Sequence, residues 1–97
     1  MSKFEKEIYL KLITEQETTD EELRRLVREY EVDRESCGAG RCAEYIDSIV
    51  KVNGRYFQFG WSKALTFNLS DEFYEMPYEV EPYEERKLMI YQRWRRV

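Results

Sequence analysis

Residues 45–62, YIDSIVKVNGRYFQFGWS, give the clearest structural signal in this chain. Two runs rich in β-branched and aromatic residues, 45–52 and 55–62, flank the dipeptide Asn53-Gly54. Asn-Gly between two such runs predicts a β-hairpin with a type I′ turn, because that turn requires positive φ at both central positions. The centre of the chain is therefore expected to be an antiparallel pair of strands.

The alternation of residues along the first run predicts what each face of this hairpin carries. Side chains two residues apart lie on the same face of a strand. One face is expected to carry Tyr45, Asp47, Ile49 and Lys51, and the other Ile46, Ser48, Val50 and Val52. Gly60, near the end of the second strand, predicts a bulge or a close backbone approach.

Two helices are expected before the hairpin. A capping box, S-x-x-E at residues 2–5, precedes a helix over about residues 3–14. Residues 7–13 also alternate as a strand would, so a strand remains an alternative there. A second capping box at 19–22 places acidic residues at the positive end of a helix over about 20–31.

The remaining segments give weaker signals. The polar, glycine-rich residues 32–41 are expected to form a loop. Ser70-Asp71-Glu72 has the composition of a cap for a short helical turn. Pro77 and Pro82 hold the chain extended on either side of Val80, which is expected to be a buried anchor. Alternation over about residues 86–96 predicts a third strand, with Trp94 on its core side.

The predicted fold class is therefore α+β. Two N-terminal helices pack on one face of a small antiparallel sheet of about three strands. The 97 residues are expected to form a single domain, with a helical half at about 1–35 and a β-rich half at about 43–97.

Composition argues against an enzyme and against a metal or cofactor site. The chain has no histidine, the commonest general base and metal ligand. Cys37 and Cys42 lack the further ligands that a structural zinc site requires, and they are expected to be free thiols, although a short disulfide between them is an alternative. No apolar run approaches the roughly 20 residues that span a bilayer, so a cytoplasmic protein without a membrane partner is expected.

Residues 71–85, DEFYEMPYEVEPYEE, combine seven acidic residues and no basic residue with four aromatic rings. An acidic aromatic surface of this kind suits a basic protein partner and repels nucleic acid. The residues expected to bind the partner are Asp71, Glu72, Tyr74, Glu75, Tyr78, Glu79, Glu81, Tyr83, Glu84 and Glu85.

The charge of the C-terminal residues 86–97 leaves a structural alternative open. This segment carries five basic residues and no acidic residue, so its charge of +5 nearly cancels the −7 of residues 71–85. The two segments are therefore candidates for pairing with each other, which would give the acidic residues a role in folding.

Two stretches carry a family resemblance: EYIDSIVKVNGRYFQFGWSKALT at 44–66 and EFYEMPYEVEPYEERKLMIYQRW at 72–94. Their aromatic hairpin, P-Y-E-V element and closing strand ending in Trp94 resemble small acidic proteins of phages and mobile elements. That group includes anti-CRISPR proteins and other host-defence inhibitors. The resemblance implies an inhibitor that binds a basic, nucleic-acid-handling protein such as a CRISPR nuclease in the cytoplasm of a bacterial host.

Two other functions remain as alternatives. A nucleic-acid-binding regulator could use a winged helix, which would need a third helix over about residues 41–50, or the cluster Arg93, Trp94, Arg95 and Arg96. An accessory protein could instead act through a homodimer, with Tyr9, Tyr45, Tyr56 and Tyr91 at its interface.

Overall fold

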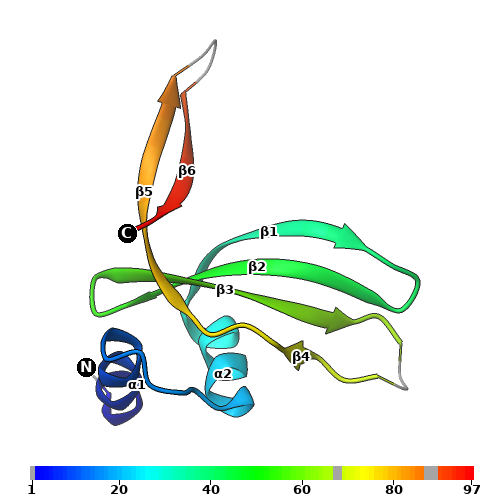
Figure 1. Ribbon diagram of the computed structural model, residues 1–97, viewed down its shortest axis with the longest axis horizontal. Helices are drawn as coiled ribbons and strands as arrows, with labels where there is room; N and C mark the ends of the chain where they lie inside the picture. Colours follow the sequence, from blue (N-terminus) through cyan, green and yellow to red (C-terminus); the bar gives the residue numbers. More distant parts are fainter. Residues whose placement is uncertain (1, 67–68, 87–89) are drawn as a thin grey trace.

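The computed structural model describes residues 2–66, 69–86 and 90–97; the side chains of residues 84–86 and 90–92 lie outside this description. In the described residues, two helices are followed by six strands (Figure 1). The elements are α1 (Lys3–Ile13), α2 (Asp20–Tyr30), β1 (Glu31–Ala39), β2 (Ala43–Val52), β3 (Arg55–Ala64), β4 (Glu72–Phe73), β5 (Tyr78–Arg86) and β6 (Ile90–Arg96).

Both predicted helices are confirmed, including the helical alternative for residues 7–13. The Ser2 side chain accepts a hydrogen bond from the Glu5 backbone N–H at the start of α1. At the start of α2, Thr19 and Glu22 form the reciprocal hydrogen bonds of a capping box. Each cap satisfies backbone N–H groups that have no partner within the helix.

The central hairpin is also confirmed. Asn53 and Gly54 both have positive φ, 50° and 78°, as a type I′ turn requires. β2 and β3 pair without a shift in register from Ala43 and Ala64 to Val52 and Arg55. Gly60 therefore lies in a regular ladder, and its role is close approach rather than a bulge.

The prediction of about three strands is wrong in number. The sheet is antiparallel, with the order β1-β2-β3-β5-β6, and β4 pairs with β3 beyond this path. The additional strands come from segments that lack the alternation of a half-buried strand, which is why their pairing is not evident from sequence pattern.

The first of these segments is β1, where residues 32–41 are predicted to be a loop. Residues 31–39 instead pair with β2 as an edge strand. All of their side chains after Glu31 are exposed, so no apolar period marks the strand. Val32 and Cys37 occupy the two register shifts between β1 and β2, as the extra residues of bulges.

The predicted helical turn at residues 70–72 is also wrong, because Glu72 and Phe73 form β4. The Asp71 carboxylate accepts a hydrogen bond from the Ala64 backbone N–H at 2.8 Å, which fastens this segment to the end of β3. The Phe73 ring stacks on Trp61 with centroids 5.4 Å apart. Tertiary contacts with β3 therefore override the local capping signal.

The predicted third strand over 86–96 corresponds to β6 at Ile90–Arg96, while Arg86 belongs to β5 and residues 87–89 lie outside the described residues. The helix that a winged-helix fold would need at 41–50 does not form, because β2 occupies residues 43–52. Ile46, Ser48 and Val50 are buried in alternation along that strand. The winged-helix alternative is therefore wrong.

The main core lies between the helices and one face of the sheet. Ile8 and Leu12 of α1 and Leu23 and Leu26 of α2 pack against buried residues of β2 and β3. The strand residues of this cluster are Ile46, Val50, Val52, Phe57, Phe59 and Trp61. Among the described helices, none is long and apolar enough to cross a membrane.

β5 leaves the sheet soon after it joins it. It pairs with β3 only from Tyr78 to Val80 and then continues as a hairpin with β6. Figure 1 shows this hairpin, called the arm below (β5 and β6), projecting from the rest of the sheet. Val80 is 3% exposed, so its predicted burial is confirmed. Trp94, predicted to lie in the core, is instead half-buried where the arm meets the sheet.

Candidate functional site

The side of the sheet turned away from the helices is called the open face. On β2 it carries Tyr45, Asp47 and Ile49, which alternate with the core residues. On β1 it carries Asp33 and Glu35, because these residues pair with Ile49 and Asp47 and paired residues share a face. Three carboxylates therefore lie side by side on two neighbouring strands.

Gly60 allows a fourth carboxylate and a tyrosine to join them. Its backbone N–H donates a hydrogen bond to Glu75 Oε1 at 3.0 Å. A Cβ atom at this position would lie 3.1 Å from Asp47 Oδ1 and 3.2 Å from the Tyr74 hydroxyl oxygen, closer than nine in ten such contacts. The absence of a side chain at Gly60 thus lets Asp47, Tyr74 and Glu75 converge on one point of β3.

These residues, together with Tyr45, form what we call the tyrosine–carboxylate cluster (Tyr45, Asp47, Tyr74 and Glu75). Tyr45 lies close enough to Tyr74 to affect its pKa. The two rings are 49% and 61% exposed, respectively, so both are accessible to a partner. The cluster thus presents two accessible rings beside two carboxylates.

The carboxylates of this region add to pKa shifts of its tyrosines that are caused first by burial. The pKa of Tyr74 is raised, first by partial burial of its hydroxyl group and then by the charges of Asp47 and Glu75. Burial likewise raises the pKa of Tyr78, and Glu75 and Asp47 add to the effect while Arg96 opposes it. Both shifts disfavour a further negative charge at the open face, as expected for a region of negative potential.

Cys37, in the second bulge of β1, also contacts the Asp47 carboxylate. Its thiol donates a hydrogen bond to Asp47 Oδ2 at 3.0 Å. That bond, partial burial and the charges of Asp47 and Glu35 raise the pKa of Cys37 from 9.0 to about 11. Cys37 and Cys42 are both free, so the alternative of a disulfide between them is not seen.

We expect Cys37 to be alkylated slowly. Because the thiolate is the reactive form, a pKa raised from 9.0 to about 11 lowers the reactive population near pH 8 by about 100-fold. The rate should keep rising with pH up to about 11. Iodoacetamide labelling followed by peptide mass spectrometry measures this rate, and Asp47→Asn should raise it. Equal labelling rates in the two proteins would contradict the role of Asp47.

The residues predicted to bind a partner do not all lie on one surface. Tyr74 and Glu75 reach the open face at Gly60, and Tyr78 lies close enough to Glu75 and Asp47 for their charges to affect its pKa. The Asp71 carboxylate accepts the hydrogen bond from the Ala64 backbone N–H in β3, and Glu72 lies exposed in β4. The side chains of Glu84 and Glu85 lie outside the described part of the chain.

The other predicted residues contact basic residues of the same chain, in part through the expected pairing of residues 71–85 with residues 86–97. Glu79 lies 3.8 Å from Arg55, and Glu81 forms an ion pair with Arg95 at 2.6 Å. The guanidinium group of Arg95 lies 5.6 Å from the ring centroid of Tyr83.

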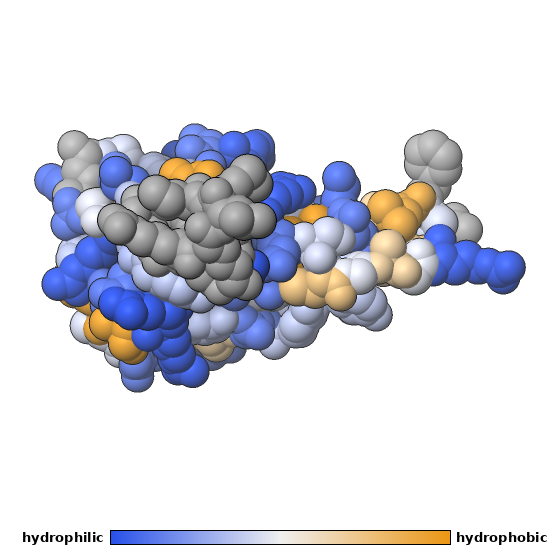
Figure 2. All heavy atoms as spheres, turned by 90° about the horizontal axis from the view of Figure 1, so that it is seen from above, coloured by the Kyte–Doolittle hydropathy of each residue, from blue (hydrophilic) through white to orange (hydrophobic). Residues whose placement is uncertain are grey.

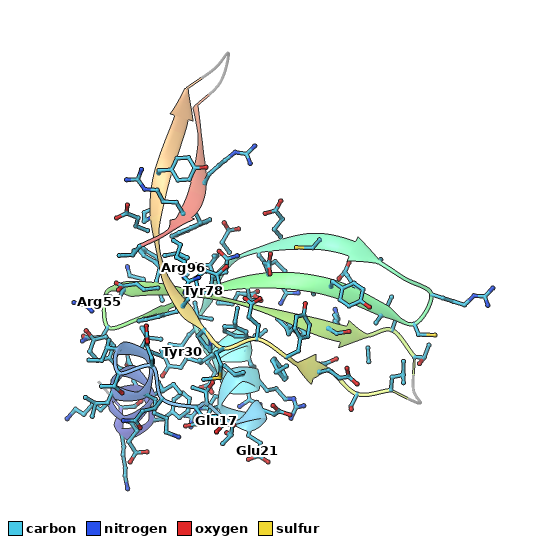
Figure 3. The ribbon with its side chains drawn as sticks, in the orientation of Figure 1. Glu17, Glu21, Tyr30, Arg55, Tyr78 and Arg96 are labelled. Carbon is cyan, nitrogen blue, oxygen red and sulfur yellow. The ribbon has the colours of Figure 1, made fainter. Side chains whose placement is uncertain are left out.

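The same pairing occurs at the base of the arm, where the guanidinium group of Arg96 lies 4.7 Å from the ring centroid of Tyr78. Figure 3 shows Arg96 beside Tyr78, with Arg55 nearby at the β2–β3 turn. Part of the run 71–85 therefore stabilises the arm.

Sequence reasoning missed Asp33, Glu35 and Asp47 as site residues, and it named Tyr45 only for a homodimer interface. Asp33 and Glu35 both lie in the predicted loop over residues 32–41, which attributes no sheet face to them. Tyr45 and Asp47 did carry a signal, because the alternation of the hairpin places both on the face opposite the core. A carboxylate on a strand face near a strand glycine is the pattern that would have identified this site.

The view in Figure 2 shows a surface that is mostly hydrophilic, with hydrophobic residues in small separate spots. Comparison with protein-family models, curated proteins and solved structures finds no match to this chain. Its function must therefore be inferred from its own residues. Within residues 2–66, 69–86 and 90–97, no group of three or more acidic or cysteine side chains is arranged to hold a metal ion.

The arrangement on the open face is suited to binding. Clustered carboxylates attract a cationic surface over long range, and exposed tyrosines supply contact area at low conformational cost. The raised pKa of Cys37 keeps its thiol protonated and poorly nucleophilic near neutral pH. Recognition of a positively charged partner is the chemistry that these groups support best.

Proposed function

We propose that this protein is a non-enzymatic binding protein that docks its open face on a basic region of another protein. The observation that carries this proposal is the convergence of Asp47, Tyr74 and Glu75 at Gly60. It supplies negative charge and an exposed ring in one place, a combination that suits a binding hot spot flanked by charge.

The free rings of the cluster strengthen the proposal. Elsewhere in the chain, Tyr78 and Tyr83 are covered by Arg96 and Arg95. Tyr45 and Tyr74, by contrast, are 49% and 61% exposed. These two rings are therefore available to the cationic side chains of a partner.

For the partner, we propose a nucleic-acid-handling protein of a bacterial host, such as a CRISPR nuclease, acting in the cytoplasm. Proteins of this kind carry arginine- and lysine-lined channels for phosphates, and an acidic surface can occupy such a channel. The resemblance to anti-CRISPR proteins favours this partner class. The protein would then inhibit by occupying the site where nucleic acid binds.

The double variant Asp47→Asn/Glu75→Gln tests this proposal. It removes two charges while leaving oxygen atoms that still accept the hydrogen bonds from Cys37 and the Gly60 N–H. We expect binding to a basic nuclease to weaken by about tenfold or more, because charge pairs at an interface contribute about 1.5 kcal/mol or more. Biolayer interferometry against a panel of purified CRISPR nucleases, at low and high salt, measures the change.

Glu17→Gln/Glu21→Gln is the matched control. Both residues are exposed near α2, on the helical side of the sheet (Figure 3). This variant changes the net charge by the same amount, so it should bind within about threefold of the wild-type protein if local charge on the open face matters. If both double variants weaken binding equally, the loss of affinity follows from net charge alone, and the proposed docking face is wrong.

A further inference from the structure

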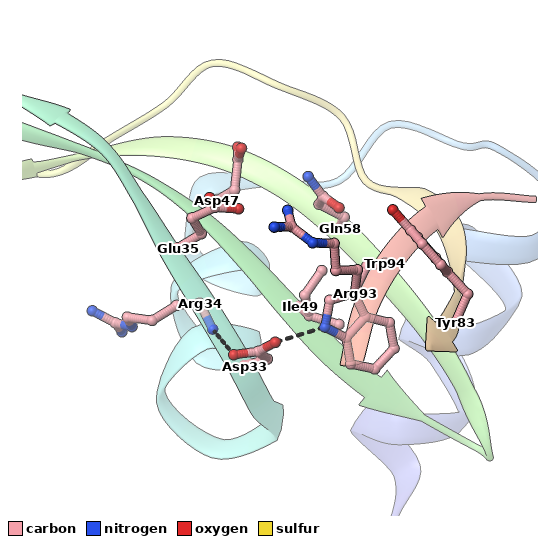
Figure 4. Close-up of a pocket in the computed structure, with 9 residues that line it drawn as sticks. All are labelled: Asp33, Arg34, Glu35, Asp47, Ile49, Gln58, Tyr83, Arg93 and Trp94. Carbon is pink, nitrogen blue, oxygen red and sulfur yellow. Dashed lines mark hydrogen bonds between the residues drawn. The ribbon is translucent and has the colours of Figure 1, made fainter. Parts of the chain in front are cut away.

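A pocket of about 400 Å³ opens on the open face where the arm meets β1 and β2 (Figure 4). The carboxylates of Asp33, Glu35 and Asp47 line one part of it. The aromatic side chains of Trp94 and Tyr83, both from the arm, line another part. The pocket thus combines negative charge with flat aromatic surfaces.

Trp94 forms a fixed wall of this pocket. Its indole N–H donates a hydrogen bond to Asp33 Oδ2 at 2.6 Å, and Asp33 Oδ1 accepts one from the Arg34 backbone N–H at 2.9 Å (Figure 4). The Trp94 ring also packs on Tyr56, with centroids 4.8 Å apart. Contacts on both the ring and the N–H hold the indole in one orientation.

A pocket with these walls favours a planar cation. A guanidinium group can stack on an aromatic ring and donate several hydrogen bonds to carboxylates in its own plane. An ammonium group is more strongly hydrated and lacks the flat surface for stacking. The chemistry of the pocket therefore distinguishes arginine from lysine.

The chain itself places an arginine there. Arg93, on β6, lines the pocket, and Figure 4 shows its guanidinium group directed into it, on the side of Glu35 and Asp47. Arg93 is nevertheless exposed. Arg93 therefore shows where a guanidinium group from an extended strand can lie in this pocket. Solvent and other solutes can also reach this position.

We propose that this pocket is an arginine-binding subsite, occupied by Arg93 in the free protein and by an arginine of the partner in the complex. The inference rests on the proposed function and names the group that the partner supplies. Arg93 is exposed and solvent weakens the attraction between exposed charges, so an arginine from a well-fitting partner can displace it. Because a site that is partly occupied has a lower apparent affinity, Arg93 acts as an internal competitor.

The test is an NMR titration of the whole protein with N-acetyl-arginine amide, and separately with N-acetyl-lysine amide. The indole N–H of Trp94 reports on the pocket wall, whereas that of Trp61 donates to Ser48 Oγ in the buried core and serves as an internal reference. We expect the arginine amide to shift the Trp94 signal with saturation and to leave the Trp61 signal in place. The lysine amide should bind more weakly.

Arg93→Gln should raise the affinity for the arginine amide by roughly threefold or more, because it removes the competitor. Arg41→Gln is the matched control: it makes the same charge change at an exposed residue between β1 and β2 that does not line the pocket. It should leave the affinity nearly unchanged. An equal gain from both variants, an equal response to both amides, or no shift of the Trp94 signal would each overturn the subsite.

This titration needs no partner protein, so its outcome is independent of the nuclease-binding assay. If the protein binds a nuclease through Asp47 and Glu75 but the Trp94 signal does not shift, the proposed function stands and the subsite proposal is wrong. If the Trp94 signal shifts but no nuclease binds, the subsite proposal stands and the proposed class of partner is wrong.

Discussion

Replacing Trp61 with alanine is expected to remove a large part of the protein's free energy of unfolding at 25 °C. Trp61 is 4% exposed in the main core, and Phe73 stacks on one side of its ring. Removing a buried aromatic side chain costs about 3–5 kcal/mol. A domain of this size has a free energy of unfolding of about 5–15 kcal/mol, so the loss consumes much of the total.

Urea denaturation followed by circular dichroism measures this loss, and Trp61→Phe is the control. Phenylalanine keeps most of the ring contacts but loses the N–H that donates to Ser48 Oγ at 2.8 Å, so a cost of about 1–2 kcal/mol is expected. Ser48 remains satisfied through its own hydrogen bond to Glu31. A loss below about 1 kcal/mol for Trp61→Ala would show that β4 and the core do not depend on this ring.

Replacing Trp94 with alanine is expected to release the arm while the rest of the sheet stays folded. An isolated two-stranded hairpin is only marginally stable in water, and β5 pairs with β3 over just Tyr78–Val80. The contacts of Trp94 with Tyr56 and Asp33 are therefore a large part of what holds the arm. Losing the ring contact and the hydrogen bond should cost about 2–3 kcal/mol locally.

Amide hydrogen exchange separates local release from global unfolding. Backbone amides of β5 and β6 should exchange about 30- to 160-fold faster in Trp94→Ala, whereas those of β2 and β3 should change little. Trp94→Phe, which keeps a ring on Tyr56 but loses the bond to Asp33, should give an intermediate effect. Unchanged exchange in the arm of Trp94→Ala would mean that pairing with β3 is sufficient to hold it.

The helices and the central hairpin could be predicted because their signals are local. The capping box of α2 and the Asn53-Gly54 turn each lie within four consecutive residues, and each specifies a backbone conformation directly. β1 could not be predicted in the same way. Its side chains face solvent on both sides of the sheet, so burial imposes no alternation on residues 31–39.

The grouping of residues on the open face could not be predicted from the sequence, for a different reason. Its carboxylates come from three separate segments, represented by Glu35, Asp47 and Glu75, and only the order of the strands brings them together. The acidic run 71–85 was correctly seen to be unusual in composition. Its pairing with Arg55, Arg95 and Arg96 depends on the register of β5 with its neighbours, which composition does not specify.

The two bulges of β1 have a consequence for how copies of this protein behave at high concentration. A long, flat edge strand offers a row of backbone groups to which another chain can add, and this is a common start of fibril growth. The extra residues at Val32 and Cys37 break that row twice, and the charged side chains of Asp33, Arg34 and Glu35 occupy the stretch between them. A second molecule therefore meets an interrupted and charged border, which discourages stacking of sheets edge to edge.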